Sequence, residues 1–408
     1  MNGKIYLASK DTCSGCLACV DACSRNAIRP VFHSDGHLYP EIKDDLCVKC
    51  GRCVDICPII SKFGFQDQAR HSKPYAVWAN DEALRFRSAS GGLFSALAVS
   101  VLLQGGVVAG ASMEGLEVKH ILISTINDLY KIQNSKYQQV ISSGIYQAVK
   151  EQLQNGRMVL FGGTSCQIAG LYCFLKECHY SGTLYTVDMI CSGFPSNQAL
   201  NVFLKKEKGL KTLIYRDKKD GNSNGQRLSG ILSDTIDQSE MKLFSHDLVY
   251  AAFSTHYTHR ESCLHCRFTY AQRKADITMG DFWGDPDFPQ EHEKGLSLAI
   301  VHSEKGLSLM RTANLNIHPT TWPKALKVNF RIVCGHFYMV RFHPAKIFKN
   351  QFFRYLSYPI LLRIYRGQES YSHLVWGPYL LYSKGLNWIE SRIRRKIVNK
   401  VLKNLAAL

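Results

Sequence analysis

The sequence has little that would place it in a membrane or among secreted, disulfide-linked proteins. Met1–Lys10 has no apolar core of the kind found in signal peptides. Gly91–Met113 has no charged residue, but a Gly-Gly pair interrupts it before it reaches the about 20 apolar residues that a membrane span needs. The run predicts instead a helix over Leu93–Leu103, a turn, and a strand over Val107–Ala111. We therefore expect a cytoplasmic protein.

Other absences exclude whole functional classes. The chain has no Gly-x-Gly-x-x-Gly turn and no Walker loop, so a conventional nicotinamide- or ATP-binding fold is unsupported. No nucleic-acid recognition motif accompanies the basic residues, so we expect no nucleic-acid partner. Of the 408 residues, 46% are hydrophobic and 20% are charged, a balance that favours folded domains over a disordered chain.

Acidic residues are scarce, at 33 against 50 Lys and Arg, and the net charge is +17. Residues 324–408 hold sixteen basic residues and only two acidic ones. The spacing of three or four residues predicts a basic amphipathic helix whose apolar side is formed by Trp388, Ile389, Ile393, Ile397, Val401 and Leu405. Three interpretations stay open: peripheral contact with the inner face of an anionic membrane, docking on an acidic partner, or packing on its own domain with a solvated basic face.

Cysteine is abundant, with fifteen residues, eight of them between Cys13 and Cys57. The eight form two copies of a Cys-x2-Cys-x2-Cys-x3-Cys spacing. In this spacing three thiolates hold one 4Fe-4S cluster and the fourth reaches the other cluster. Paired zinc knuckles are the alternative, but a zinc site closes with ligands in two pairs and has no use for the third Cys. The predicted ligand sets are Cys13, Cys16, Cys19 and Cys57 for one cluster, and Cys47, Cys50, Cys53 and Cys23 for the other.

Four of the other seven cysteines stand where ligands gather in an α/β fold. Cys166 follows a strand and a Gly-Gly turn at the start of a helix, and Cys191 ends a strand. Cys263 and Cys266 form a Cys-x2-Cys pair before another predicted strand. Because strand ends at the carboxyl edge of a sheet commonly hold ligands, these four residues predict a third cluster, with zinc as the metal alternative. The residues interpreted as buried apolar filler are Cys173, Cys178 and Cys334.

Hydrophobic patterning divides the chain into four parts. Residues 1–62, which carry the doubled cysteine spacing, resemble a bacterial-type two-cluster ferredoxin, and this implies an α+β ferredoxin-like domain. We expect a polar linker over 63–74, an α/β domain over 75–335 and the helical basic tail over 336–408. In the α/β part, strands are predicted at 75–79, 121–124, 158–161, 184–190 and 277–279, and helices at 145–155 and 167–176. A flexible loop is expected over 218–226.

Six collinear motifs, counting the ferredoxin segment as one, resemble the coenzyme F420 hydrogenase/dehydrogenase beta-subunit family. The others are Arg87-x2-Ser90-Gly91-Gly92-Leu93-Phe94-Ser95-Ala96, Ser135-Lys136-Tyr137, residues 161–171, residues 188–196, and Ser262-Cys263-x2-Cys266 with residues 276–283. The resemblance covers roughly residues 1–335. It implies an FAD flavoprotein with an α/β flavin domain that also holds a cluster on Cys166, Cys191, Cys263 and Cys266.

The chain departs from the family beside two of these cysteines. It has Ser165 where the family usually has Pro, and Ser192 where the family usually has His. The thiols themselves are kept, so the departures concern the substrate side. Whether coenzyme F420 itself is used stays open.

The flavin contacts follow from the same motifs. The Ser-Gly-Gly turn could cradle the FAD pyrophosphate, because glycines let the backbone approach and a helix N-terminus favours anions. Its alternative is a Ser N-cap followed by glycines for close helix–sheet packing. Lys136 could bind a phosphate and Tyr137 could stack on a ring, or the two could form a plain surface pair. Asp281 and Trp283 stand where a predicted strand ends, near the proposed third cluster, and Trp283 could equally fill the core. The residues assigned to the cofactor are Ser90, Gly91, Gly92, Lys136, Tyr137 and Thr164; no catalytic residue is assigned.

The resemblance predicts an oxidoreductase in which FAD converts single electrons into a two-electron step on an unidentified acceptor. The alternative is an electron-transfer or scaffold subunit that serves a partner enzyme and has no substrate of its own. The expected partner is accordingly a redox protein or a small-molecule acceptor. Relatives of this fused form often lie in gene clusters for bacterial surface polysaccharides, which suggests a role in polysaccharide biosynthesis.

Overall fold

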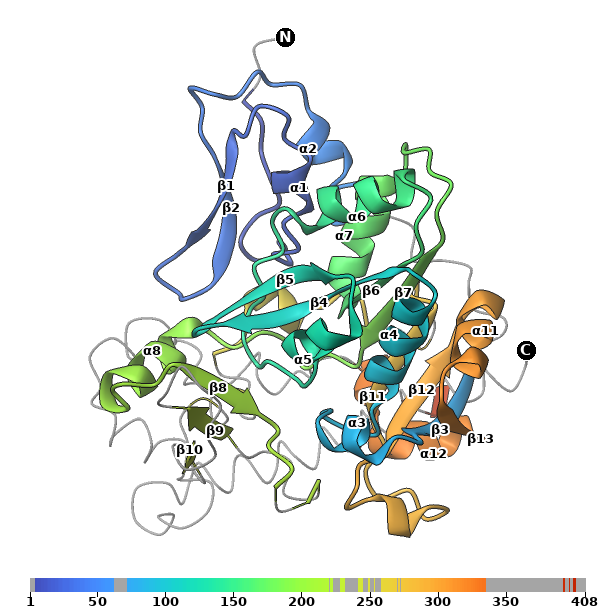
Figure 1. The fold of residues 1–408 in the computed structure, drawn as a ribbon. Coiled ribbons are helices and arrows are strands. Elements are labelled where there is room, and N and C mark those ends of the chain that lie inside the picture. The colour runs from blue at the N-terminus through green and yellow to red at the C-terminus, as the bar shows by residue number, and fades with distance from the viewer. Residues whose placement is uncertain are drawn as a thin grey trace.

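A computed structural model gives the fold of the chain (Figure 1). It describes residues 4–61, 72–219, 258–269, 271 and 273–334, with short pieces at 221–222, 228–231, 241–244, 249 and 253 and single residues at 392, 396, 399 and 400. Most of the predicted basic tail lies outside this part of the chain, and so do residues 62–71, which include most of the predicted linker.

A mixed eight-stranded sheet forms the centre of the molecule, in the order β13-β3-β12-β11-β7-β6-β4-β5. Its four inner strands β4, β6, β7 and β11 run parallel, and antiparallel strands flank them on both sides. The carboxyl ends of the parallel strands therefore share one edge. The strands are β3 Lys73–Ala79, β4 Val107–Glu114, β5 Glu117–Ile123, β6 Val159–Thr164, β7 Leu184–Met189, β11 Ile277–Asp281, β12 Ser297–Val301 and β13 Leu315–Pro319.

Helices cover both faces of this sheet because its inner strands are apolar on both sides. Val108 and Leu160 belong to the core under α4 (Leu93–Leu103) and α11 (Glu304–Thr312). Their sequence neighbours Val107 and Val159 point the other way, as strand geometry requires, and pack under α6 and α7. The other helices of the domain within the described residues are α3 Glu82–Phe86, α5 Leu129–Ile132, α6 Ile145–Gln154, α7 Ser165–Leu175, α10 Glu261–Leu264, α12 Trp322–Val328 and α13 Arg331–Cys334, with 3-10 turns at Ile126–Asp128 and Pro289–Glu291.

The N-terminal segment is a small unit placed beside α6 and α7 (Figure 1). An antiparallel hairpin of β1 (Ile28–Phe32) and β2 (Leu38–Ile42) joins two single-turn helices, α1 (Ala18–Asp21) and α2 (Arg52–Asp55). Helices this short have little stability alone, so the segment depends on its docking and on whatever its thiols bind.

A second, smaller sheet lies beside the central one. It consists of the antiparallel strands β8 (Thr212–Tyr215), β9 (Leu228–Ile231) and β10 (Met241–Phe244). Strands β8 and β9 share an apolar core with α8 (Asn197–Lys206). It faces the turn of the β4–β5 hairpin, whose Met113 and Leu116 pack on the same core.

Most predicted elements are confirmed. The helix over Leu93–Leu103 has the predicted bounds, and a strand starts at Val107 as expected. The strand predicted at 121–124 begins earlier, at Glu117, because it pairs with β4 along its length. Among the described residues, no helix has the length and apolar character that crossing a bilayer requires.

Candidate functional site

Four cysteines of the ferredoxin-like segment face one another around α1. Burial together with the neighbouring Cys57 and Cys13 thiols raises the pKa of Cys16 to about 12. Burial and the nearby Cys16, Cys13 and Cys57 likewise raise the pKa of Cys19. These mutual influences require proximity, so the structure brings together the four residues that the spacing assigned to one cluster: Cys13, Cys16, Cys19 and Cys57.

The other four cysteines form a second group around α2. The pKa of Cys53 is raised by burial and then by its neighbours Cys50, Cys47 and Cys23. Cys23 also accepts a hydrogen bond at its sulfur from the backbone N–H of Ala27, at 3.2 Å. The crossed arrangement, in which Cys23 joins the later group and Cys57 the earlier one, is the one expected from the doubled motif.

The four later cysteines also converge, at the carboxyl edge of the central sheet. Cys166 starts α7 after β6, Cys191 follows β7, and Cys263 lies in α10. After burial and an opposing hydrogen bond from Thr164, the neighbours that raise the pKa of Cys166 are Cys266 and Cys191. Burial and then Cys263 raise the pKa of Cys191 to about 12. Helix, strand end and loop thus place four thiols at one site.

Backbone amides support these sulfurs. Gly193 N–H donates to Cys191 Sγ at 3.2 Å, and Phe268 N–H donates to Cys266 Sγ at 3.4 Å. The Thr164 hydroxyl lies 3.1 Å from Cys166 Sγ. Hydrogen bonds of this kind stabilise thiolate ligands and set the potential of a bound cluster.

A zinc ion and a 4Fe-4S cluster need different separations between their thiolate ligands. Four thiolates on one zinc ion lie about 2.3 Å from the metal and hence roughly 3.8 Å from one another. Among the described residues, no three His, Cys, Asp or Glu side chains converge closely enough for a single metal ion. A cubane is held through four separate irons, so its thiolates stand farther apart around it.

A buried ion pair lies beside the third thiol group. Arg273 Nη1 donates to Asp188 at 3.2 Å, to the Ser165 hydroxyl at 2.8 Å and to the Met189 carbonyl at 3.0 Å. Its positive charge opposes the increase in the pKa values of Cys191 and Cys266. Ser165, where the family has Pro, thus belongs to the network that holds this cation. Arg273 could not be recognised in the sequence, because no local pattern marks it.

The first thiol group is packed directly against α7, the helix whose first turn carries Cys166 of the third group. Gly170 of α7 lies so close to Cys16 that an added Cβ would stand 3.1 Å from its Sγ. The fully buried Tyr146 donates its hydroxyl hydrogen bond to the Cys16 carbonyl at 2.7 Å, and the Gln167 carbonyl lies 3.3 Å from the same oxygen. Cys16 is also among the charges that raise the pKa of Cys166. The second group adjoins the first, because Cys53 contributes to the raised pKa of Cys19.

Arg260 fixes the ferredoxin-like segment to the loop that carries Cys263. This fully buried guanidinium donates to the Cys13 carbonyl at 2.6 Å and to the Leu38 carbonyl at 2.7 Å. It also lies 3.9 Å from the centre of the Tyr39 ring, within the range of a cation–π contact. Asp21 adds a second link, since its carboxylate accepts from Gly144 and Tyr146 N–H at the start of α6.

The Ser-Gly-Gly turn does not fit the role of a phosphate cradle. The Gly91 N–H already donates to the Ser297 hydroxyl at 2.9 Å, and the Ser90 hydroxyl donates to the Leu296 carbonyl at 2.8 Å. A Cβ on Gly91 would lie 2.5 Å from the Val77 carbonyl oxygen. These contacts match the alternative, in which the glycine allows the turn to pack on the sheet. The N-cap of α4 is Gly92, at φ 82°, rather than Ser90.

Lys136 and Tyr137 lie in a more enclosed environment than a surface pair. Burial lowers the pKa of Lys136 to about 7, and its Nζ donates to the Gln133 carbonyl at 2.6 Å. The Tyr137 ring packs on Phe253, with 4.4 Å between ring centres, and on Tyr215 at 5.7 Å. Thr164, assigned to the flavin, forms the capping box of α7 with Gln167 instead.

Two further cations surround the Ser-Gly-Gly turn and were missed in the sequence. Arg216 makes a bidentate ion pair with Asp281, at 2.8 and 3.0 Å, and lies over the ring of Trp283. Lys218 donates to the backbone carbonyls of Arg85, Ser90 and Lys294. Burial lowers the pKa of Lys218 to about 7. This start of the loop predicted at 218–226 is therefore anchored, and most of its remainder lies outside the described residues.

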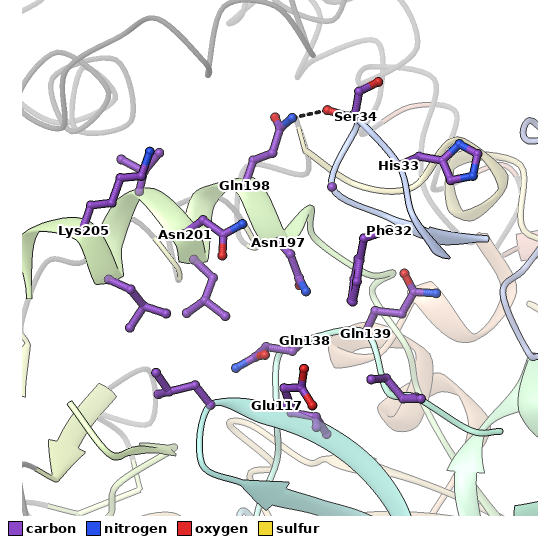
Figure 2. Close-up of a pocket in the computed structure, with 17 residues that line it drawn as sticks. Phe32, His33, Ser34, Glu117, Gln138, Gln139, Asn197, Gln198, Asn201 and Lys205 are labelled. Carbon is purple, nitrogen blue, oxygen red and sulfur yellow. Dashed lines mark hydrogen bonds between the residues drawn. The ribbon is translucent and has the colours of Figure 1, made fainter. Parts of the chain in front are cut away.

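A separate pocket of about 520 Å³ opens between the ferredoxin-like hairpin, the β4–β5 turn and α8 (Figure 2). Phe32, Glu117, Gln138, Asn197 and Asn201 are among its lining residues. None of the six residues assigned to the flavin lines it.

The cysteines interpreted as filler behave as expected where they are described: Cys173 is buried in the core under α7, and Cys178 packs against that core. The side chain of Cys334 lies outside the described part of the chain.

Two family models match separate stretches of this chain. Residues 156–321 match the family model for the carboxyl-terminal part of the coenzyme F420 hydrogenase/dehydrogenase beta subunit. Residues 12–59 match the 4Fe-4S dicluster domain. A chain of the xenon-derivatised F420-reducing NiFe hydrogenase complex from Methanosarcina barkeri is 16% identical, with a TM-score of 0.47, over 71% of this chain and 93% of that chain. Among curated protein sequences, none matches significantly.

Proposed function

We propose that this chain is an iron–sulfur oxidoreductase with three clusters, because residues 156–321 match the family model of the coenzyme F420 hydrogenase/dehydrogenase beta subunit and residues 12–59 match the 4Fe-4S dicluster domain. The observation that carries the proposal is the convergence of Cys166, Cys191, Cys263 and Cys266 next to the first ferredoxin thiol group. When bound, the clusters supply one-electron transfer and FAD supplies the exchange between one and two electrons.

The order of the thiol groups supports a linear path through the molecule. Cys50, in the second group, is exposed, whereas Cys16 of the first group is buried against Gly170 of α7. The third group lies beyond this contact, because Cys166 belongs to the first turn of the same helix α7. Tyr146 and Arg260 hold the backbone carbonyls of Cys16 and Cys13 in fixed positions. An external partner therefore meets the second group first.

The motif resemblance supports FAD as a cofactor of this chain, and Lys136 is its principal proposed contact. A lysine whose pKa lies near 7 gains a proton readily when a phosphate approaches it. Tyr137 is the next residue in the chain, and its ring already packs on Tyr215 and Phe253. The Ser-Gly-Gly turn supports the sheet rather than the cofactor.

Lys136→Met separates this assignment from a structural role. We expect FAD occupancy after reconstitution to fall at least tenfold, while iron content stays unchanged. Lys131→Met is the matched control, because Lys131 is exposed in the neighbouring α5 and pairs with Asp128 at 2.7 Å. Equal occupancy in both variants removes Lys136 from the flavin site, and a wild-type chain that retains no FAD removes the flavin from the proposal.

The function itself is tested by breaking the third group alone. In the anaerobic, reconstituted protein, reduced methyl viologen should bleach the FAD absorbance rapidly. Cys191→Ala should slow this at least tenfold and leave about eight irons, those of the dicluster domain. Cys178→Ala, a half-buried thiol outside all three groups, is the control. Unchanged bleaching in Cys191→Ala contradicts a path through the third group.

Two kinds of electron acceptor are compatible with this function. In the first, the chain itself reduces or oxidises a small molecule, in a polysaccharide pathway as the family association suggests. In the second, it serves a partner enzyme as an electron-transfer subunit. Turnover of a candidate acceptor by the purified chain supports the first form, and turnover only after addition of a partner enzyme supports the second.

A further inference from the structure

We infer that the pocket between the ferredoxin-like hairpin and α8 binds a neutral, polyhydroxylated ligand of the carbohydrate class. The pocket encloses about 520 Å³, within the range of about 300–1,000 Å³ typical of small-molecule sites. The inference concerns binding and does not depend on the proposed electron path.

The walls of the pocket are held in place before any ligand arrives. The Ser196 hydroxyl donates to the Asp35 carbonyl at 2.7 Å, and Asn197 N–H donates to the Gly36 carbonyl at 3.0 Å. The Gln198 side chain donates to the Ser34 carbonyl, which Figure 2 shows at the rim. The start of α8 and the hairpin tip therefore form one rigid frame, which lowers the entropy cost of binding.

Uncommitted amides face the cavity from this frame. Asn197 and Asn201, one turn apart on α8, have no side-chain hydrogen bond within the described part of the chain, and both project toward the cavity in Figure 2. On the opposite wall, Gln138 uses its Nε2 to donate to Tyr215 Oη at 2.8 Å, which leaves its Oε1 for a ligand. Each carboxamide offers donor and acceptor groups side by side, the pattern that neighbouring hydroxyls of a sugar satisfy.

The remaining lining explains why a carbohydrate fits better than a nucleotide or another anion. Phe32 is 44% exposed, and its ring stands in the pocket opposite Gln139, where it can pack against the C–H face of a sugar ring (Figure 2). Glu117 supplies a carboxylate acceptor, and its neighbour Lys119 pairs with it at 3.3 Å. Among the described lining residues Lys205 is the one lysine or arginine, so no cluster of positive charge awaits a phosphate.

The pocket adjoins the first thiol group. Gln139 accepts from Leu38 N–H at 3.0 Å and lies so near Gly15 that an added Cβ there would stand 2.5 Å from its Nε2. Gly15 lies between Cys13 and Cys16. One side chain therefore separates a bound sugar from the loop that holds the first cluster.

An array of immobilised hexoses, N-acetylhexosamines and uronic acids, as single sugars and as oligosaccharides, tests the inference on the full, cluster-loaded chain. We expect binding of at least one neutral sugar, weakened at least tenfold by Phe32→Ala and by Asn201→Ala. Phe32→Tyr keeps the ring and should keep the binding. Phe86→Ala is the matched control, because Phe86 is an exposed phenylalanine outside the pocket, at 58%.

Each outcome decides the matter. Absence of binding to every sugar overturns the inference, and so does binding that Phe32→Ala and Asn201→Ala leave unchanged. The iron content and visible absorbance of each variant, measured on the same samples, show that the fold is intact. If Phe32→Ala fails to load clusters, Asn201→Ala on the exposed face of α8 carries the test alone. Since no electron transfer is measured, failure here leaves the proposed oxidoreductase function unaffected.

Discussion

Replacement of Arg260 by methionine should loosen the ferredoxin-like segment from the rest of the molecule. The guanidinium donates to the Cys13 and Leu38 carbonyls at 2.6 and 2.7 Å and packs on Tyr39. Hydrogen bonds to a charged group contribute about 1.5–3 kcal/mol each. The variant has no charge left to bury, which offsets part of this loss. Each carbonyl also keeps one neutral donor, the Ser262 hydroxyl at 2.8 Å from the Cys13 oxygen and Gln139 Nε2 at 3.3 Å from the Leu38 oxygen. Because a weaker donor remains on each carbonyl, we expect the free energy of local opening to fall by about 2–3 kcal/mol, the contribution of one hydrogen bond to a charged group.

Hydrogen–deuterium exchange measures this opening directly. A loss of about 2–3 kcal/mol corresponds to faster exchange of the β1–β2 amides by about thirtyfold to just over a hundredfold, at about 1.4 kcal/mol per factor of ten. Arg29→Met is the matched control, since Arg29 is exposed on the same hairpin. Exchange that rises less than tenfold in Arg260→Met, or equally in both variants, refutes the docking role.

The same variant has an electronic consequence. Arg260 places a buried positive charge beside the backbone of Cys13, and reduction adds negative charge to a cluster bound there. Loss of the cation should therefore lower the midpoint potential of one cluster, with a smaller shift in Arg260→Lys, because a lysine that reaches the site keeps the charge. Redox titration followed by electron paramagnetic resonance measures this, and identical potentials in all three proteins would exclude an electrostatic role.

Three further predictions concern single contacts. Asp21→Ala removes the acceptor for two N–H groups at the start of α6 and should destabilise the chain by about 2 kcal/mol, the upper end of the range for helix caps, in chemical denaturation; an unchanged midpoint contradicts this. Burial lowers the pKa of His120 to about 4, so below pH 6.5 the unfolded chain binds a proton that the folded chain does not. The free energy of unfolding should therefore fall by about 1.4 kcal/mol per pH unit between pH 6.5 and 4, up to roughly 3 kcal/mol. His120→Gln should flatten this slope, and parallel pH profiles of the two proteins would refute the prediction. Gly91→Val should prevent correct folding whether or not FAD is present, because its side chain meets the Val77 carbonyl and Ser297 N–H; a folded variant with normal thermal stability would contradict the packing role.

The parts of the site that depend on short spacing were predictable from the sequence. Cysteines three residues apart on a tight loop face the same centre whatever surrounds them, so the doubled motif predicts its own crossed groups. The helix at Leu93–Leu103 and the strand at Val107 were equally predictable, because a Gly-Gly turn separates two apolar runs. The sheet's parallel centre placed Cys166 and Cys191 at one edge, as alternating strands and helices suggest.

The contacts between the parts could not be read from the sequence. Arg260 lies 247 positions from Cys13, and Tyr146 lies 130 positions from Cys16, so no local pattern marks either hydrogen bond. The Ser-Gly-Gly turn was ambiguous for another reason. Glycines that admit a phosphate and glycines that admit a neighbouring strand have the same sequence, and only the position of Ser297 distinguishes the two. The basic helix from Trp388 onward remains a prediction, since it lies almost wholly outside the described residues.

The number of irons in the anaerobically reconstituted chain tests the central claim most directly. Three 4Fe-4S clusters require about twelve irons and as many acid-labile sulfides per chain. Replacement of Cys166 and Cys263 together by alanine should lower the count to about eight and leave the dicluster domain loaded. A wild-type value of about eight that this double replacement does not change would contradict a third cluster, and with it the path from the ferredoxin-like segment into the central domain.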